Sequence, residues 1–269
     1  MELDLALLDE IAKLTNEAGA AILDIYARGA EGVEAQRKDD GSPVTAADRA
    51  AHGILVSGLA RLTPRVHVVS EEDKGVSWSP DREPWWLVDP LDGTKEFLKQ
   101  TGEFTVNVAL VQDGLPVGGV VYAPALGRTW IGGPEGGEVR ENGLTRPLGI
   151  RSVDPSRLCV VASQDHAGPM VRRLLKRTPG VEALSMGSSL KFCLIAEGRA
   201  DLYLRDGPTM EWDTGAAHAV LQAAGGQVFT MEGVPVTYGK HEFRNSHFVA
   251  VGDQTFPWRQ LLELHSTGE

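Results

Sequence analysis

The sequence has little cysteine and no long apolar run. Of its 269 residues only Cys159 and Cys193 are cysteine, and both lie in apolar stretches without metal-ligand spacing. We therefore expect buried, reduced thiols and a cytoplasmic compartment rather than a disulfide-stapled secreted domain. No apolar run approaches the ~20 residues of a transmembrane helix. The first turns carry Glu2, Asp4 and Asp9 instead of a basic leader, which argues against a secretory signal.

The sequence also lacks repeats, low-complexity tracts and an excess of positive charge. Lys and Arg total 26 against 37 Asp and Glu, so the formal net charge is −11. Such a chain would repel a phosphate backbone, which argues against sequence-independent binding of nucleic-acid polymers. An acidic protein that handles phosphates would need metal ions. The 42% hydrophobic and 23% charged residues are typical of a globular protein with a sizeable core, in one large or two medium domains.

Hydrophobic periodicity predicts a mixed α and β protein. Helices are expected at residues 7–25, 51–62, 170–176, 189–196 and 214–224. Strands are expected at residues 66–70, 85–88, 104–111, 117–122, 158–162, 200–204, 227–229 and 248–251. Residues 74–84 are expected to form an exposed loop. Because α and β segments alternate regularly only from about residue 151, we place a soft boundary near residue 150.

An acidic run, Asp-Pro-Leu-Asp-Gly-Thr at residues 89–94, follows a strand that is expected to be buried on both faces. Pro90 has no amide donor, so strand pairing should stop at Asp89. Asp92 then precedes a helix start, at the sheet edge where α/β proteins bind ligands. Both carboxylates and the carbonyl of Leu91 suit Mg²⁺, and Mn²⁺ fits the same oxygens. The positive end of the helix that follows favours a phosphate.

Two further carboxylates are expected at strand ends. Glu71 follows the strand predicted at residues 66–70, and Asp213 directly precedes another helix start. Three strand-to-loop transitions that each carry a carboxylate are hard to explain by helix capping alone. The alternative is that Asp89 merely ends a strand and Asp92 merely caps a helix.

Two residues near this run have a structural interpretation beside the functional one. Asp48 stands three residues after Thr45, which is the spacing of a capping box. A structural cap is therefore a full alternative for Asp48. The hydroxyl of Thr94 can likewise be only a hydroxyl in a helix turn.

The second half of the chain offers two similar choices. The small-residue turn at residues 187–189 leads into a helix, where backbone N–H groups can approach an anion and Lys191 can meet a second phosphate. The alternative is a Ser-capped helix with a solvated lysine. His166 follows a predicted strand, and a single loop histidine is more often structural or solvated than functional.

Together these strings resemble the inositol monophosphatase superfamily of Mg²⁺-dependent, lithium-sensitive phosphatases. Its hallmarks are a Glu-Glu pair, a strand ending in Asp-Pro-[Ile/Leu]-Asp-Gly-Thr, and a late Trp-Asp that opens a helix. They stand here at Glu71-Glu72, residues 89–94 and Trp212-Asp213. The strings similar to one branch, the CysQ-type 3'(2'),5'-bisphosphate nucleotidases, are residues 86–97, 102–107, 120–124 and 187–193. The similarity covers about residues 5–250.

The resemblance implies an α/β (α+β) sandwich with layered αβαβα order and two sub-domains, and the metals would lie between them. Residues 1–150 would form an α+β sub-domain with most metal ligands. Residues 151–269 would form an α/β sub-domain with Asp213 and the nucleotide side. The two would make one continuous phosphatase unit.

The resemblance also implies roles for individual residues. The metal ligands, for two or three Mg²⁺ ions, would be Glu71, Asp89, the carbonyl of Leu91, Asp92 and Asp213. The catalytic residues would be Asp48, Glu71 and Thr94, of which Asp48 and Thr94 orient the attacking water. The substrate contacts would come from Glu71, Leu91, Asp92, Gly93, Thr94, Ser163, His166, Gly187, Lys191 and Asp213.

One string departs from the family pattern. Where the family often has Ser-Arg-Ser-His, this chain has Ser-Gln-Asp-His at residues 163–166. Gln164 replaces an arginine and Asp165 adds negative charge, which leaves the contact to a second phosphate open. Arg205 or Arg244 would have to take its place.

The implied activity is hydrolysis of the 3'-phosphate of adenosine 3',5'-bisphosphate (PAP) to AMP, with 3'-phosphoadenosine 5'-phosphosulfate (PAPS) as a further substrate, in sulfur assimilation. The partner would be a small phosphorylated nucleotide. The compartment would be the cytoplasm, with peripheral attachment to the inner membrane as the alternative, and the oligomeric state is open. An inositol-1-phosphate phosphatase and a fructose-1,6-bisphosphatase-like enzyme are alternative functions. An inactive nucleotide- or metal-binding protein would need a damaged ligand set, but every expected carboxylate is present.

Overall fold

The computed structural model describes residues 3–29, 35–37, 43–73, 83–162, 168–178 and 180–266. The helices are α1 (Leu5–Tyr26), α2 (Ala46–Leu62), α3 (Thr94–Leu98), α4 (Pro169–Arg177), α5 (Leu190–Ala196), α6 (Gly215–Ala223) and α7 (Trp258–Ser266). The first strands are β1 (Ala35–Arg37), β2 (Pro43–Thr45), β3 (His67–Ser70), β4 (Trp85–Asp92), β5 (Thr105–Gln112), β6 (Leu115–Ala123) and β7 (Arg128–Gly133). The others are β8 (Gly136–Glu141), β9 (Leu144–Pro147), β10 (Cys159–Ala162), β11 (Glu182–Ser185), β12 (Leu202–Arg205), β13 (Gln227–Thr230) and β14 (Phe248–Val251).

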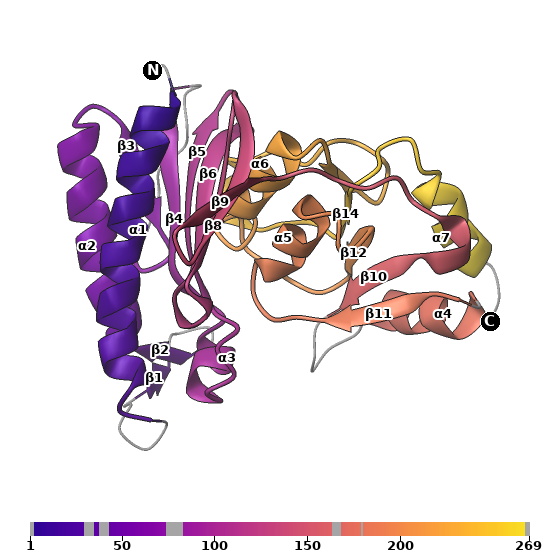
Figure 1. Cartoon of the computed structure of the whole chain (residues 1–269), viewed down its shortest axis with the longest axis horizontal. Helices are drawn as coiled ribbons and strands as arrows, with labels where there is room; N and C mark the ends of the chain where they lie inside the picture. Colours follow the sequence, from indigo (N-terminus) through magenta and orange to yellow (C-terminus); the bar gives the residue numbers. More distant parts are fainter. Residues whose placement is uncertain are drawn as a thin grey trace.

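Helices and sheets alternate in layers along the molecule (Figure 1). Helices α1 and α2 cover one face of a sheet with the order β3-β4-β5-β6-β7-β8-β9, and α5 and α6 cover its other face. A second sheet, β11-β10-β12-β14-β13, follows, and α4 and α7 close the far end. The layered αβαβα fold expected from the resemblance is therefore confirmed. The sub-domain boundary near residue 150 stays a prediction.

Strand β4 is buried on both faces, as predicted. Trp85 and Leu87 point into the core shared with α5 and α6, whereas Trp86 and Val88 point into the core under α1 and α2. This alternation follows from the two-residue period of a strand. A central strand of this kind is held rigidly, so the residues at its end have fixed positions.

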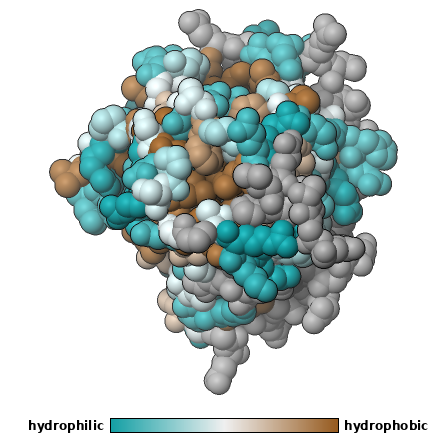
Figure 2. Space-filling view, turned by 90° about the vertical axis from the view of Figure 1, so that its right-hand side faces the viewer, coloured by the Kyte–Doolittle hydropathy of each residue, from teal (hydrophilic) through white to brown (hydrophobic). Residues whose placement is uncertain are grey.

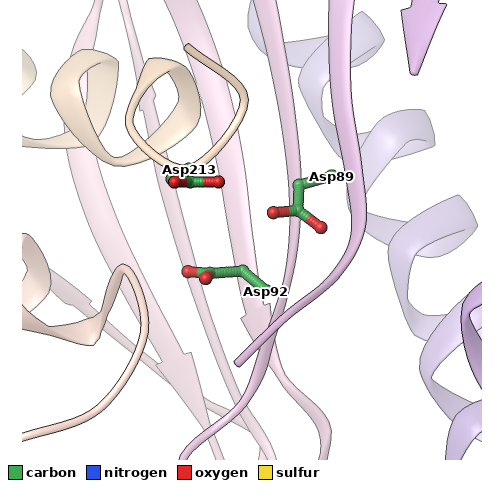
Figure 3. Close-up of side chains that lie close together, drawn as sticks. All are labelled: Asp89, Asp92 and Asp213. Carbon is green, nitrogen blue, oxygen red and sulfur yellow. The ribbon is translucent and has the colours of Figure 1, made fainter. Parts of the chain in front are cut away.

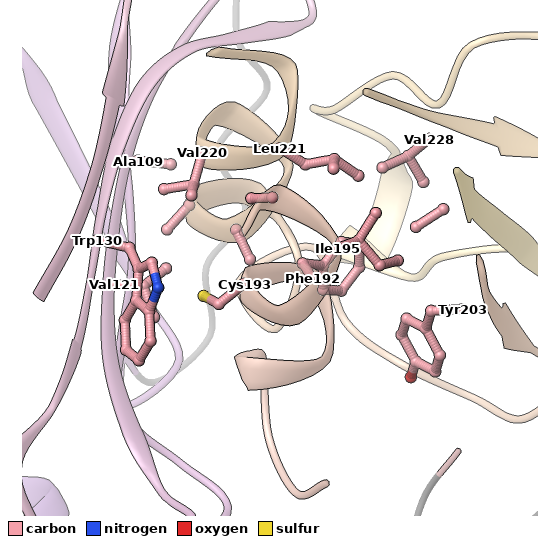
Figure 4. Packing of buried hydrophobic residues seen from close by; sticks show 14 of the residues in the cluster. Ala109, Val121, Trp130, Phe192, Cys193, Ile195, Tyr203, Val220, Leu221 and Val228 are labelled. Carbon is pink, nitrogen blue, oxygen red and sulfur yellow. The ribbon is translucent and has the colours of Figure 1, made fainter. Parts of the chain in front are cut away.

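The core between the two sheets brings α6 unusually close to the first sheet (Figure 4). A Cβ atom on Gly119 would lie 2.7 Å from the carbonyl oxygen of Ala216, and one on Gly132 would lie 2.5 Å from the Cα of Val220. Only glycine allows this approach, because any side chain would collide with the helix backbone. The packing fixes α6, and with it the turn that precedes the helix.

A third core lies between the second sheet and the pair α4 and α7. On this end of the molecule, hydrophilic residues surround a smaller hydrophobic area (Figure 2). Helix α4 buries Val171 and Leu174, whereas its exposed positions are Arg172, Arg173, Lys176 and Arg177. The outer layer is therefore amphipathic in the ordinary sense. None of the described helices has the length and apolar character that crossing a membrane requires.

The predicted helices and strands within the described residues are confirmed, with ends that differ by a few positions. The elements that the sequence pattern did not predict include β7, β8, β9, β11 and α7. Most of the expected loop at residues 74–84 lies outside the described residues. Cys159 and Cys193 are free and buried, as expected, and burial raises the pKa of both thiols.

The prediction that pairing stops at Asp89 is wrong. Strand β4 pairs Asp89 with Asn107, shifts register, and resumes with Asp92 opposite Thr105. Pro90 falls between these pairs, where its missing amide removes no ladder hydrogen bond. Residues three apart in a regular strand point to opposite faces, but one extra residue in a bulge corrects this. The shift therefore lets Asp89 and Asp92 face the same site.

Candidate active site

Three carboxylates converge where the first sheet meets α6. Asp89, Asp92 and Asp213 each place an oxygen within 4.8 Å of the others (Figure 3). Asp89 and Asp92 come from β4, and Asp213 comes from the turn before α6. Asp89 is buried, and the other two are partly exposed. Residues far apart in the chain thus form one acidic cluster, which opens to solvent through Asp92 and Asp213.

The electrostatics of this cluster are unfavourable without a counter-ion. Burial raises the pKa of Asp89 well above its ordinary value, and the facing Glu71, Asp92 and Asp213 raise it further. Burial and then the Asp92 carboxylate also raise the pKa of Asp213. Like charges at this distance are stabilised by a shared cation, and oxygen-only donors select a hard one. The donor set therefore fits Mg²⁺ or a similar divalent ion.

Glu71 and Leu91 lie against this cluster. Glu71 directly follows β3, where its amide donates to the carbonyl of Val88 at 3.1 Å, and its carboxyl group hydrogen-bonds Asp89. The buried Leu91 donates its amide to Oδ1 of Asp89 at 3.0 Å. The structure thus brings together all the residues that the resemblance implied as metal ligands.

Asp213 does not end a strand, contrary to expectation. It lies in a turn three residues after an isolated β-bridge between Met210 and Arg244. Its Oδ2 accepts the amide of Met210 at 2.9 Å. The helix predicted at residues 214–224 placed Asp213 correctly before α6, but could not show that a turn carries it.

Asp48 has its structural role and also faces the site. Its Oδ2 accepts both the amide and the hydroxyl of Thr45 at 2.7 Å, so the capping box is confirmed. Its Oδ1 accepts the hydroxyl of Thr94 at 3.5 Å, and the same hydroxyl lies 3.3 Å from the carbonyl of Leu91. Thr94 therefore bridges Asp48 to the acidic run, so the helix-turn interpretation describes only part of its contacts.

The N-cap of α3 is Gly93, not Asp92. Gly93 has φ = +90°, a conformation that costs little only for glycine, and the helix has no side-chain cap. The alternative that Asp92 caps this helix is therefore wrong. Oδ2 of Asp92 instead accepts hydrogen bonds from the hydroxyl of Ser188 at 2.5 Å and from the amide of Ser189 at 2.7 Å.

The turn at residues 187–189 does direct backbone N–H groups at anions, but the anions are protein carboxylates. Besides the bonds to Asp92, the amide of Gly187 donates to Oε2 of Glu103 at 2.7 Å. Ser189 is the N-cap of α5 and makes no side-chain cap, so the Ser-capped alternative is wrong. Glu103 was missed as a functional candidate, because nothing local indicates a contact 84 positions away.

Lys191 is buried, so the solvated-lysine alternative is also wrong. Its Nζ donates to the carbonyls of Ser188 at 2.6 Å and Met186 at 3.3 Å. Burial lowers its pKa to about 8, against the opposing effect of the nearby Asp92 carboxylate. Lys191 is therefore a buried cation, and it lines the cavity beside Asp92.

A cavity of about 640 Å³ joins these features. Asp92 and Asp213 of the acidic cluster line it, and so do the cations Lys191 and Arg205. An apolar wall is formed by Val171, Leu204 and Phe248. Among the described residues, nothing accepts the buried Nε of Arg205, whereas its Nη2 donates to the carbonyl of Pro208 at 2.9 Å. Arg244 is not among the described lining residues.

Part of the predicted substrate side cannot be placed. Ser163, Gln164, Asp165 and His166 lie outside the described residues, although Ala162 and Gly168 on either side line the cavity. The expected contacts of Ser163 and His166 stay predictions.

Comparison with known proteins gives a consistent result. The profile of the inositol monophosphatase family matches residues 4–263. The chain is 45% identical over 246 residues to the 3'(2'),5'-bisphosphate nucleotidase CysQ of Escherichia coli K12, which covers 90% of this chain and 98% of that protein. Its fold matches crystalline CysQ from Bacteroides thetaiotaomicron with a TM-score of 0.78 and 35% identity, over 91% and 96% of the two chains. An inositol monophosphatase from Zymomonas mobilis shares the fold alone, with a TM-score of 0.75 and 24% identity over 95% and 97% of the chains.

Proposed function

The chain belongs to the inositol monophosphatase family, and from this premise we propose that it is a metal-dependent phosphatase that converts adenosine 3',5'-bisphosphate to AMP and phosphate. One observation carries the substrate class: a single cavity is lined by two groups, the carboxylates Asp92 and Asp213 of the acidic cluster and the buried or half-buried cations Lys191 and Arg205. A molecule with two phosphates can occupy both. The 45% identity to a nucleotidase over nearly its whole length supports the same substrate.

In this proposal Glu71, Asp89, Asp92, Asp213 and the Leu91 carbonyl hold the divalent cations. When bound, two or three Mg²⁺ ions, or Mn²⁺, would neutralise these carboxylates, polarise the phosphoryl oxygens and lower the pKa of an attacking water. The raised pKa values of Asp89 and Asp213 support this role, because such carboxylates are poised for a cation. The same charge would repel the substrate from the metal-free protein.

Asp48 and Thr94 orient the attacking water. The Thr94 hydroxyl lies within reach of two acceptors, Oδ1 of Asp48 and the carbonyl of Leu91, so its one proton is donated to them and its lone pairs remain for a water. A water that donates to Thr94 can pass a proton toward Asp48, which acts as the acceptor. The backbone amides of Gly93 and Thr94, at the start of α3, contact the scissile phosphate.

Lys191 and Arg205 bind the second phosphate. Among the described residues, Nε of Arg205 has no hydrogen-bond partner. This supports Arg205 as the contact to the second phosphate, in place of the family arginine that Gln164 replaces. The adenosine lies along the apolar wall, with Ser163 and His166 as additional contacts. Gly187 contributes space and not its amide, because that amide is bonded to Glu103 and a Cβ atom would lie 2.9 Å from the Glu103 carbonyl oxygen.

The test is phosphate release with Mg²⁺ from PAP, inositol 1-phosphate and fructose 1,6-bisphosphate, each with and without lithium. We expect PAP to be hydrolysed fastest and lithium to inhibit. K191M should raise KM for PAP about tenfold and leave inositol 1-phosphate turnover unchanged, since a charge-assisted hydrogen bond contributes about 1.5 kcal/mol. Faster hydrolysis of inositol 1-phosphate would retain the metal cluster and overturn the nucleotide assignment.

A further inference from the structure

The three carboxylates of the acidic cluster are supported in different ways. Asp89 and Asp92 lie on β4, which pairs with β3 up to Val88 and with β5 at both aspartates. Asp213 lies on a turn, and the nearest sheet-like contact is the isolated bridge at Met210. Something other than a sheet must hold this turn if Asp213 is to keep its place in the cluster.

We propose that Glu211 is a positioning residue for Asp213, because it anchors this turn to the loop at residues 237–245. Glu211 is fully buried, at 0% exposure, and does not line the cavity. Its carboxylate accepts the amides of Gly239 at 2.7 Å and Lys240 at 2.9 Å, and pairs with Nζ of Lys240 at 2.7 Å. The inference rests on the proposed function only in taking the cluster as a cation site.

The backbone of Glu211 connects this anchor to α6. The amide of Glu211 donates to the carbonyl of Phe243 at 2.7 Å. The main chain and the side chain of Glu211 therefore both hydrogen-bond the loop at residues 237–245. Its carbonyl accepts the amides of Thr214 at 3.1 Å and Gly215 at 2.9 Å, the first donors of the helix. Asp213 lies within the segment that these bonds enclose.

Asn245 holds the turn from the same loop at a second point. Its Nδ2 donates to the carbonyl of Met210 at 2.7 Å and to the hydroxyls of Thr209 at 3.2 Å and Thr214 at 3.1 Å. Met210 in turn donates its amide to Oδ2 of Asp213. Met210 therefore orients the carboxylate of Asp213. Asn245 holds the carbonyl of Met210, and the anchored Glu211 is the next residue in the chain.

The physical consequence is a dependence of cation affinity on Glu211. Mg²⁺ requires near-ideal octahedral geometry with oxygens at about 2.0–2.1 Å, so a small displacement of one ligand weakens binding. Residues behind the ligands of metal sites contribute about 10- to 100-fold in affinity. Because Glu211 touches neither cavity nor cluster, its replacement should act through the position of Asp213.

The experiment is a titration with Mn²⁺, in which free ion is followed by electron paramagnetic resonance, on the full chain. We expect E211Q to weaken Mn²⁺ binding about 10- to 100-fold. Because the loss is one of affinity, saturating Mn²⁺ should restore most of the turnover of PAP, with an unchanged KM. K240M keeps the backbone donors to Glu211 and should weaken Mn²⁺ binding about threefold, a change of roughly 0.7 kcal/mol.

The matched control is D201N. Asp201 is also buried, at 2% exposure. Its carboxylate accepts one backbone amide, from Cys159, where Glu211 accepts two, and it likewise pairs with one cationic side chain, Arg151. It does not line the cavity, so D201N should lower thermal stability and leave Mn²⁺ affinity at the wild-type value. A general loss of stability would weaken binding in both variants, whereas a positioning role affects E211Q alone.

Wild-type affinity in folded E211Q, or an equal loss in D201N, would overturn the positioning role. If E211Q does not fold, an unchanged affinity in K240M overturns it. The proposed metal site fails separately, if the wild-type chain binds no Mn²⁺ or if D213N binds it as tightly as the wild type.

Discussion

Two kinds of buried carboxylate can be compared among the described residues. Asp201 and Glu197 each face an arginine: Arg151 at 2.7 Å from Asp201, and Arg128 at 2.9 Å from Glu197. Asp89 is as deeply buried as Asp201, yet it faces other carboxylates. Burial therefore does not distinguish an acid that is paired within the chain from one that the proposed function assigns to a cation.

The difference is where the counter-charge comes from. In the first kind the chain supplies a cation and N–H donors, and the pair stabilises the folded state. In the second kind, under the proposed function, the positive charge is bound from solution. The folded chain without a cation then carries an electrostatic cost that cation binding removes. Removing a carboxylate should thus have opposite effects on stability at the two kinds of site.

The largest expected effect is that of D89N. Phosphate release should fall about 100-fold or more, because cation-assisted catalysis contributes several kcal/mol. The folded pKa of Asp89 is raised, so its contribution to stability is present at low pH and is lost as pH rises through that pKa. Asparagine has no such loss.

Thermal unfolding at pH 7 should show the effect of D89N on stability both without and with Mg²⁺. With a chelator, D89N should melt above the wild type, and added Mg²⁺ should raise the melting temperature of the wild type more than that of the variant. Full activity in D89N, or a lower melting temperature in chelator, would contradict the comparison.

A buried histidine sharpens the comparison, because neutral side chains supply the hydrogen-bond partners of both its ring nitrogens. His218 is fully buried, with Nδ1 at 3.0 Å from the Tyr238 hydroxyl and Nε2 at 2.6 Å from Oε1 of Gln227. Burial lowers its pKa to about 4, and the Gln227 hydrogen bond opposes this shift. Between pH 6.5 and pH 4, His218 is therefore protonated in the unfolded chain and neutral in the folded chain.

Between pH 7 and pH 4 this histidine should reduce the free energy of unfolding by about 3 kcal/mol. Urea unfolding of the wild type and H218Q at both pH values isolates that contribution, since the other titrating groups are common to both. An equal acid loss in the two proteins would show that His218 is not kept neutral by the fold.

At the paired site, D201N should cost about 2 kcal/mol of unfolding free energy, because the buried amide of Cys159 and the Arg151 side chain lose a charged acceptor. Activity at saturating Mg²⁺ should stay at the wild-type level. Urea unfolding and phosphate release measure the two quantities. A variant as stable as the wild type would mean that this pair does not stabilise the fold.

The smallest expected effect concerns Lys191, one of the two cations that line the cavity. The folded pKa of Lys191 is lowered to about 8, so its positive charge is present below that pH and lost above it. From pH 7 to pH 9, kcat/KM for PAP should fall about tenfold through this group. K191M should have a low and flat profile over the same range, and a wild-type profile that stays flat would exclude a role for the lysine charge.

The acidic run was predictable because its signals are local. A continuous apolar strand, a proline and two acids within six residues indicate a site without knowledge of any distant contact. The capping box of Asp48 was readable for the same reason. The bulge that turns Asp89 and Asp92 to one side was not, since it depends on the register against β5.

The missed features depend on distant contacts or on weak patterns. All four residues of β9 are exposed, and Val139 is the one buried residue of β8, which leaves no alternation to detect. Glu103 and Glu211 look like surface acids, and only the fold brings Gly187 and Lys240 to them. The sequence therefore indicated the residues at the acidic cluster, but not those that hold them in place.

The division of the acidic cluster between β4 and the turn before α6 has a consequence for biosynthesis. Asp89 and Asp92 leave the ribosome well before Asp213, and nascent domains begin to fold from the N-terminal side. A growing chain therefore holds only part of the cluster until α6 docks on the glycines of the first sheet. Under the proposed function, cation binding would follow this docking, and a chain that terminates before Asp213 would expose Asp89 and Asp92 without the third carboxylate of the cluster.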